Sequence, residues 1–241
     1  MSASRTARER VRAELVREIT DIARTQLATE GATGISLRAV AREMGMASSA
    51  IHRYFPTKDD LLTALIVDGY NAAGAAVEAA DAVCPRTEYT TRWLAVCHAI
   101  RDWALANPHE YALIYGSPVP GYRAPQDTIA PAARSTIVYG RILADAHTAG
   151  HLNAPDICPP PPDILATDAQ AVRAVMPGVS ADLVTRGVIA WTAIYGMVSF
   201  ELFGQFNNVI THRTEFFDHN MRSLAYFLGL PPQTPETQRF R

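Results

Sequence analysis

The spacing of apolar residues predicts helices along almost the whole chain. Residues 8–30 contain no glycine or proline, and Gly31 and Gly34 are placed to end a helix there. Its apolar side chains recur at the 3.6-residue period of one helix face: Val16, Ile19, Ala23 and Leu27. No segment alternates apolar and polar residues as a strand does. We therefore expect an all-α protein.

Two short helices and one longer helix follow. A helix over 36–44 would begin with Ser36 as its N-cap and end at Gly45. A second over 48–55, with Ser48 as its N-cap, must stop before a proline. Thr57-Lys-Asp-Asp is similar to a capping box and starts a helix running to about residue 82.

Beyond Pro85 the pattern predicts a larger helical bundle. Residues 155–162 contain five prolines and predict a loop. Helices are expected over 88–106, 108–115, 131–150, 163–176, 180–206 and 215–228. The chain thus combines a three-helix N-terminal domain with a larger C-terminal bundle.

Composition places the chain among ordinary globular proteins. Its 241 residues are 48% hydrophobic and 19% charged, which separates it from disordered proteins. No run approaches the ~20 apolar residues of a membrane span, and the N-terminus lacks the apolar region of a secretory signal. Three cysteines without a CxxC pair argue against a disulfide framework and a structural zinc site. We expect a cytoplasmic, soluble protein with no cofactor and no membrane partner.

Charge is divided unevenly along the chain. The first 58 residues hold ten Lys/Arg and six Asp/Glu, whereas the remainder holds twelve and eighteen. Chance scatter could give this split, but a basic segment on an acidic body also suits a polyanionic partner. Arginine is densest at the N-terminal tip, at Arg5, Arg8, Arg10, Arg12 and Arg17.

Residues 36–55 have the spacing of a helix-turn-helix, whose second helix lies in the DNA major groove. Ala41 is small where the two helices cross, and Gly45 permits a left-handed turn. Ile51 fills the space between the helices. The alternative is an αα-hairpin in an ordinary helical protein.

Residues 19–66 resemble the DNA-binding domain of TetR-family transcriptional regulators, above all in the run from Ile51 to Lys58, Ile-His-Arg-Tyr-Phe-Pro-Thr-Lys. Trp191-Thr-Ala-Ile-Tyr-Gly196 is similar to the Trp-x-x-aliphatic-His-Gly signature of one TetR C-terminal class, with Tyr195 replacing His. The resemblance implies a homodimer that binds a palindromic operator in double-stranded DNA and releases it when a small-molecule effector binds. It assigns 1–56 to DNA binding and 57–241 to dimerisation and effector binding, and it favours repression.

The resemblance also implies which side chains face DNA. Serine hydroxyls at the start of the second helix can meet a phosphate or base edge, and Arg38 can read guanine or grip a phosphate. His52 stands where relatives usually have Tyr, so Arg53 is added as a substitute contact. The predicted DNA-facing residues are Arg38, Ser48, Ser49, His52, Arg53, Tyr54 and Lys58. The alternative for each is a solvated surface side chain.

Large aromatic residues in the bundle indicate an effector pocket. Aromatic walls with few charges can enclose a mostly apolar cavity, which favours a lipophilic or aromatic effector. The predicted lining residues are Trp103, Tyr111, Tyr115, Trp191 and Tyr195. At helical spacing the same residues also pack as an ordinary core.

Two apolar stripes predict a four-helix dimer interface. They comprise Leu183, Val184, Val188 and Ile189 on one helix, and Phe216, Phe217, Met221, Leu224 and Phe227 on the last. The alternative is that both stripes pack within the subunit's own core.

Catalysis is not indicated, because the sequence has no HExxH, GxSxG, Walker or Rossmann pattern. His147 and His151 have i, i+4 spacing, but Gly150 intervenes, so a solvated helix end is favoured over a metal site. Glu201 lies among apolar residues and needs a partner, either an effector or a capping or inter-subunit group. The alternative function is a DNA-binding or ligand-storage protein without switching, which ligand-reversible operator binding would exclude. Turnover of a bound ligand would indicate an enzyme.

Overall fold

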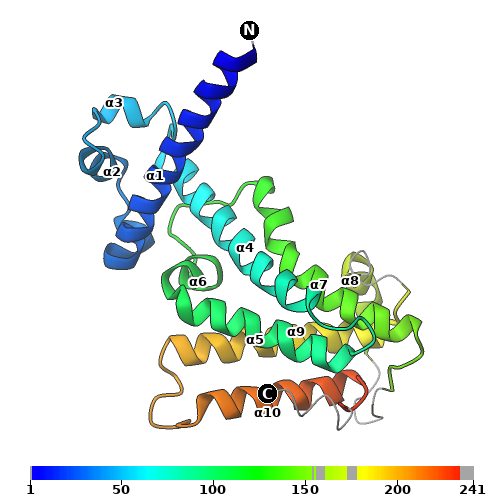
Figure 1. The fold of residues 1–241 in the computed structure, drawn as a ribbon. Helices are drawn as coiled ribbons and strands as arrows, with labels where there is room; N and C mark the ends of the chain where they lie inside the picture. The colour runs from blue at the N-terminus through cyan, green and yellow to red at the C-terminus, as the bar shows by residue number, and fades with distance from the viewer. Residues whose placement is uncertain (1, 154, 156–160, 173–177, 234–241) are drawn as a thin grey trace. The chain divides into compact units, whose positions relative to one another are not determined.

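The computed structural model describes residues 2–153, 155, 161–172 and 178–233, and in these residues the regular structure is entirely helical (Figure 1). The predicted all-α fold is thereby confirmed. The helices are α1 (Ser2–Gly34), α2 (Leu37–Glu43), α3 (Ser48–Ile51), α4 (Lys58–Ala82), α5 (Tyr89–Ala106), α6 (Pro108–Tyr115), α7 (Ile129–Thr148), α8 (Leu165–Val172), α9 (Ala181–Leu202) and α10 (Arg213–Leu228). A 3-10 turn, η1 (Gln126–Thr128), precedes α7.

Contacts divide the chain into two compact units, which we describe separately. The first comprises Met1–Asn71 and Asn107–Pro131, and the second comprises Ala72–Ala106 and Ala132–Arg241. α4 contributes residues to both units. The predicted boundary between the DNA-binding domain and the effector-binding domain lies after residue 56, and it stays a prediction.

The first unit is built on the apolar face of α1. Ile19, Ala23 and Leu27 are buried together with residues of α2, α3 and the start of α4. Gly31 has a φ of 69° and interrupts the helical geometry of α1, at the position where the sequence predicted the end of this helix. The capping box at the start of α4 is also present, because the N–H of Thr57 donates to Asp60 and the N–H of Asp60 donates to the Thr57 hydroxyl.

The second unit is a bundle in which α5 packs against α9 and α10. Trp93 is fully buried in this bundle, and its indole N–H donates to the carbonyl oxygen of Met221 at 2.9 Å. Within the described residues, α9 is the one helix long and apolar enough to cross a membrane. It nevertheless packs on three neighbouring helices and carries Arg186 and Glu201, both buried and ion-paired. These features are typical of a core helix.

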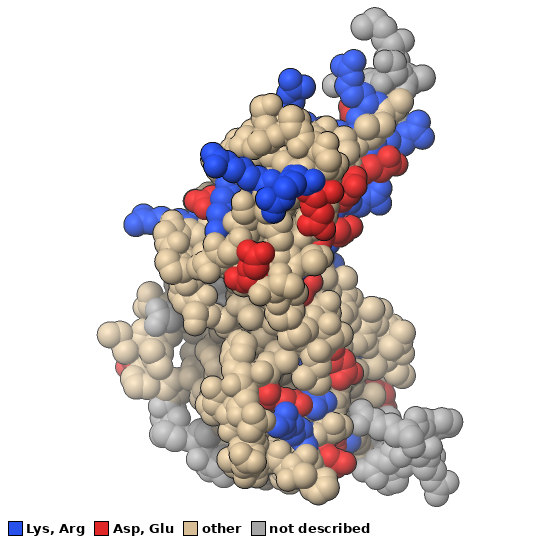
Figure 2. All heavy atoms as spheres, turned by 90° about the vertical axis from the view of Figure 1, so that its left-hand side faces the viewer, with Lys and Arg blue, Asp and Glu red and all other residues tan. Residues whose placement is uncertain are grey.

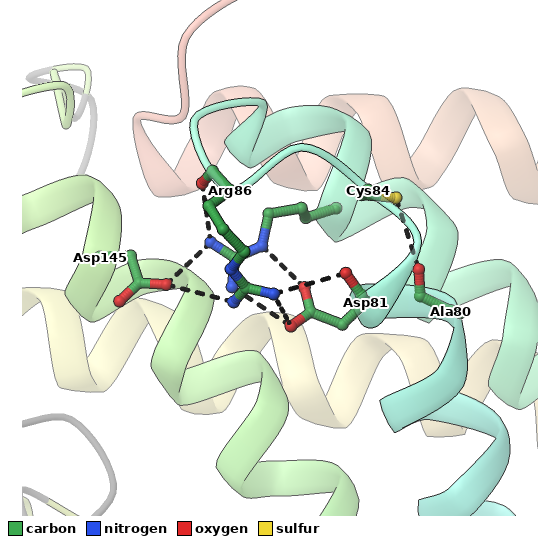
Figure 3. A network of polar contacts seen from close by, with 6 residues as sticks. Ala80, Asp81, Cys84, Arg86 and Asp145 are labelled. Atoms are coloured by element: carbon green, nitrogen blue, oxygen red, sulfur yellow. Dashed lines mark hydrogen bonds and ion pairs between the residues drawn. The ribbon is translucent and has the colours of Figure 1, made fainter.

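A network of charged side chains around the buried Arg92 joins α4, the loop after it, α5 and α7 in the second unit (Figure 3). The Arg92 guanidinium on α5 is fully buried and donates to Asp81 on α4 at 2.7 Å and to Asp145 on α7 at 2.8 Å. Arg86, in the loop between α4 and α5, donates to Asp81 at 2.8 Å. Burial raises the pKa of Asp81, but the hydrogen bonds from Arg92 and Arg86 outweigh it and leave that pKa lowered.

Glu201 finds its partner within the same chain. Both of its carboxylate oxygens accept hydrogen bonds from Arg101 on α5, at 2.8 and 2.7 Å. The expectation that an effector, a cap or a second subunit would satisfy this carboxylate is therefore wrong. The pairing residue lies 100 positions away in the sequence, beyond the reach of local pattern analysis.

The predicted dimer stripes are partly used inside the chain. Leu183, Val184, Phe217 and Met221 are buried in the subunit's own core, so their assignment to an interface is wrong. Val188 and Ile189 of the same predicted stripe are exposed instead, as are Trp191 and Phe200 further along α9. The prediction for the proline-rich segment falls largely outside the described residues, at 156–160.

Candidate DNA-binding surface

α2 and the turn after it have the predicted geometry. Ser36 is the N-cap of α2, and its hydroxyl accepts a hydrogen bond from the Ala39 N–H at 3.4 Å. Gly45 has a φ of 67°, a left-handed conformation that glycine adopts at little steric cost. No heavy atom would lie within 4 Å of a Cβ at this position. Glycine is therefore needed for its backbone conformation and not for space.

The crossing of α2 and α3 is also as predicted. Ala41 and Ile51 are buried where the two helices meet. The N–H of Met46 donates to the carbonyl oxygen of Ala41 at 2.8 Å, which ties the turn to α2. The Gln26 side chain accepts from the N–H of Ser36 at 3.0 Å and so fixes the start of α2 to α1. This is the arrangement of a helix-turn-helix.

α3 is shorter than predicted and begins differently. Its N-cap is Ala47, which provides no side-chain cap, and Ser48 is already the first helical residue. The predicted capping role of Ser48 is therefore wrong. The helix ends at Ile51, and the N–H of Tyr54 bonds to the carbonyl oxygen of Ile51 in the turn that follows. Residues 52–55, predicted as helix, form this turn.

The structure brings most of the predicted DNA-facing residues to the surface of one compact region. The exposed ones come from α2, α3 and the turn after α3, and they are Arg38, Ser48, Ser49, His52 and Arg53. Tyr54 and Lys58 are half-buried. Because Ser48 caps nothing, its hydroxyl is available to a ligand together with that of Ser49.

His52 and Lys58 both make contacts that orient them. The Nδ1 atom of His52 lies 2.9 Å from the carbonyl oxygen of Pro56. Since a carbonyl oxygen only accepts, Nδ1 carries the hydrogen and Nε2 is left for another partner. Lys58 donates to the Thr33 carbonyl oxygen at 2.6 Å. A lysine ammonium has three donors, so two remain for a phosphate.

Tyr54 packs against the N-terminal part of α1. The Arg12 guanidinium lies over the Tyr54 ring, 5.3 Å from its centroid, and donates to the carbonyl oxygen of Arg53 at 3.4 Å. The sequence pattern did not connect Arg12 with the recognition segment, because the two lie 41 positions apart. The high density of arginine at the N-terminal tip of the chain was the only sequence feature that pointed to this contact.

Comparison with known proteins matches both halves of the chain. Residues 19–65 match the bacterial regulatory proteins of the tetR family, and residues 93–224 match the tetracyclin repressor-like C-terminal domain. The HTH-type transcriptional regulators Rv1816 of Mycobacterium tuberculosis and Mb1846 of Mycobacterium bovis are 36% identical over 230 residues, covering 93% of this chain and 95% of theirs. The chain belongs to the TetR family of transcriptional regulators.

Solved structures agree with this assignment. The crystal structure of SCO4313 is 32% identical, with a TM-score of 0.74, and the match covers 90% of this chain and 97% of that one. The TetR-family regulator PfmR from Thermus thermophilus, 16% identical with a TM-score of 0.54 over 89% of this chain and 99% of its own, supports the fold alone. TetR-family proteins bind DNA through the helix-turn-helix domain, which here is formed by α1–α3.

The predicted effector residues divide between the two units. Tyr111 and Tyr115 belong to the first, where their ring centroids lie 5.0 Å apart and Tyr115 meets Tyr70 edge-on at 5.7 Å. Trp103, Trp191 and Tyr195 belong to the second. The ring centroids of Trp191 and Tyr195 lie 5.8 Å apart, and Trp191 is exposed on α9.

An open groove lies elsewhere, between α1 and α2. Its volume is about 370 Å³, and polar side chains dominate its lining, among them Thr25, Thr29, Glu30 and Arg42. This lining does not suit a lipophilic effector. For metal binding, no group of three or more His, Cys, Asp or Glu side chains gathers in the described residues.

Proposed function

We propose that this TetR-family regulator is a homodimer that represses transcription from a palindromic operator and releases the operator when a small lipophilic or aromatic effector binds. We place it in the cytoplasm, without a cofactor. The observation that carries the proposal is the helix-turn-helix geometry of α2 and α3, with its exposed polar residues on one surface. A DNA-binding protein without switching is the alternative.

The proposed DNA contacts combine base reading with phosphate binding. Arg38 on α2 and the two serines that open α3 lie where a helix-turn-helix meets the major groove. We assign Arg38 to a base or phosphate, and His52, Arg53 and Lys58 to phosphates that position α3. Tyr54 supports this surface through its contact with α1. We assign its hydroxyl to a hydrogen bond with the DNA backbone.

The exposed apolar side chains of α9 support the proposed dimer. Ile189 is 49% exposed and Phe200 is 51% exposed on the same helix. Large apolar side chains that remain in water on a helix otherwise packed in a core are typical of an interface. The two-fold axis of such a dimer would present two α3 helices to half-sites about one DNA turn apart, roughly 34–36 Å.

The proposed effector contacts are the predicted aromatic residues, Tyr111 and Tyr115 in the first unit and Trp103, Trp191 and Tyr195 in the second. α4 contributes to both units, so a ligand that favours another position of α4 would change the spacing of the two α3 helices. Such couplings are typically 1–3 kcal/mol, which lowers operator affinity roughly 5–150-fold at saturation.

The proposal is tested by selecting bound sequences from random DNA duplexes with the purified protein. We expect a palindrome, and we expect Arg38→Ala to relax the preference at one base position, at a cost of roughly 1–3 kcal/mol. For the switch, Trp103→Ala and Tyr195→Ala should blunt effector-induced release while ligand-free affinity stays nearly unchanged. If both variants still release DNA normally, the pocket lies elsewhere.

A further inference from the structure

α1 begins well before the residues that match the TetR N-terminal family. The match to the TetR N-terminal family begins at residue 19, and Ile19 is also the first fully buried core residue of α1. Residues 7–14 are all exposed. At 1.5 Å per residue, residues 7–18 carry the helix roughly 18 Å beyond Ile19. Of this stretch, Val16 packs against the core, whereas residues 7–14 extend beyond it.

One face of this extension is basic, and it continues the buried face of α1. Arg8, Arg12 and Val16 are four residues apart, and Ile19 follows three residues later, so all four lie on one face of the helix. The face that is apolar in the core thus becomes cationic where the core ends. The same spacing places Arg10 and Arg17 on the opposite side of the helix, where they carry the same total charge as Arg8 and Arg12.

Arg12 places this basic face beside the recognition segment. Its guanidinium donates to the Arg53 carbonyl oxygen and lies over the Tyr54 ring. Arg8 lies one turn further out, about 6 Å along the axis. It is exposed and has no hydrogen-bond or ion-pair partner in the described part of the chain. Figure 2 shows Lys and Arg side chains along this end of α1, with acidic ones among them.

We infer that residues 7–18 of α1 form an N-terminal arm that makes a second DNA contact. In this contact Arg8 and Arg12 bind the sugar–phosphate backbone next to the major groove that α3 enters. The inference rests on the proposed DNA binding. α3 has four residues and spans about 6 Å, less than two base-pair steps of 3.4 Å. An arm that begins beside the end of α3 and carries cations outward extends the contact along the duplex.

The continuity of the arm with the recognition segment favours DNA over an acidic protein as the partner. Arg12 touches Arg53 and Tyr54, two residues proposed to face DNA. Any polyanion that meets those residues therefore meets the arm. Arginine contacts to phosphate carry no base preference, so the arm adds affinity and salt dependence, whereas sequence choice stays with α2 and α3.

The test compares two double variants that remove equal charge from opposite faces of one helix. Arg8→Gln with Arg12→Gln removes the proposed contacts, and Arg10→Gln with Arg17→Gln is the matched control. Affinity for the duplex recovered by selection, flanked by a further helical turn on each side, is measured over a range of salt. We expect the first variant to flatten the plot of log affinity against log salt by about 0.9 for each phosphate that is no longer neutralised. The control variant should change this slope little.

Two further measurements separate the arm from the rest of the surface. Because Arg12 also packs on Tyr54, Arg8→Gln alone should flatten the slope by about 0.9 per protomer without affecting stability. Trimming the flanks of the duplex should lower wild-type affinity and leave the Arg8→Gln, Arg12→Gln variant unchanged. If the wild type prefers the selected duplex but both double variants share its slope, the arm is not a DNA contact. If the wild type shows no preference for any duplex, the proposed function fails as well.

Discussion

Arg92 is fully buried, and its charge is balanced by carboxylates from two other helices (Figure 3). A buried ion pair contributes little net stability compared with an apolar pair, but removing one partner leaves an uncompensated charge in the core. Asp81 is buried and bonds two guanidinium groups, whereas the Asp145 side chain is 41% exposed. The two carboxylates are therefore unequal.

Asp81→Ala should lower the free energy of unfolding by about 3 kcal/mol, since Asp145, which is partly exposed, is then the one carboxylate left beside Arg92. Asp145→Ala is the matched control and should cost less than about 1 kcal/mol, because water replaces an exposed carboxylate. Urea denaturation measures both. Equal losses would show that the network is not centred on Asp81.

Asp218 makes the stability sensitive to acid. Burial raises its pKa, but hydrogen bonds from Arg222 at 2.7 Å and His98 at 3.0 Å outweigh this and lower the pKa from 3.8 to about 2. A carboxyl whose pKa is lower in the folded state stabilises the fold above pH 3.8, and this contribution is lost as the pH falls toward 2.

Asp218→Asn should therefore destabilise the protein at neutral pH by at most about 2 kcal/mol and should remove part of the acid dependence between about pH 4 and 2. Chemical denaturation at several pH values measures this difference. A variant curve parallel to that of the wild type across the range would contradict the assignment.

At the scale of elements, the helix-turn-helix depends on the backbone of Gly45. Its φ of 67° costs a residue with a Cβ roughly 1–2 kcal/mol, although the site has room for the side chain. Gly45→Ala should destabilise the first unit by about this amount and weaken DNA binding. Gly45→Asn should lose less, because asparagine tolerates the left-handed region. Thermal denaturation and DNA affinity test the pair, and equal losses for both variants would indicate a steric cause.

The elements that the sequence predicted well are those set by local signals. Ser36, Gly45 and the capping box at Thr57 act on neighbouring backbone groups, so their roles are visible in short segments. The bounds of α6, residues 108–115, were predicted correctly for the same reason. α3 was predicted too long, because its end is set by the chain turning at His52, whose ring contacts Pro56.

Long-range partners escaped prediction because sequence spacing carries no information about them. Arg101 and Glu201 are 100 positions apart, and Arg12 meets a residue 41 positions away. The DNA-facing residues came from the family resemblance, and the structure places five of the seven on an exposed surface. The pocket residues had no such support, because aromatic residues at helical spacing also fill a core.

At the scale of the whole molecule, the exposed apolar side chains of α9 bear on the proposed dimer. Ile189→Glu with Phe200→Glu should shift the protein to monomers, because each buried charge would lack a partner in the interface. Light scattering at micromolar concentration measures the mass. Val83→Glu, which alters an exposed apolar residue in the loop after α4, is the control and should leave the mass unchanged. A wild-type protein that is already monomeric would contradict the dimer.

The central claim is that two copies of α3 read one operator together. The most direct measurement compares affinity for the selected palindrome with affinity for the same duplex after one half-site is scrambled, at one fixed salt concentration. Each mismatched base pair typically costs ~1–3 kcal/mol, so we expect the scrambled half-site to weaken binding by orders of magnitude, while two protomers still bind each intact palindrome. Equal affinity for the two duplexes would contradict the account.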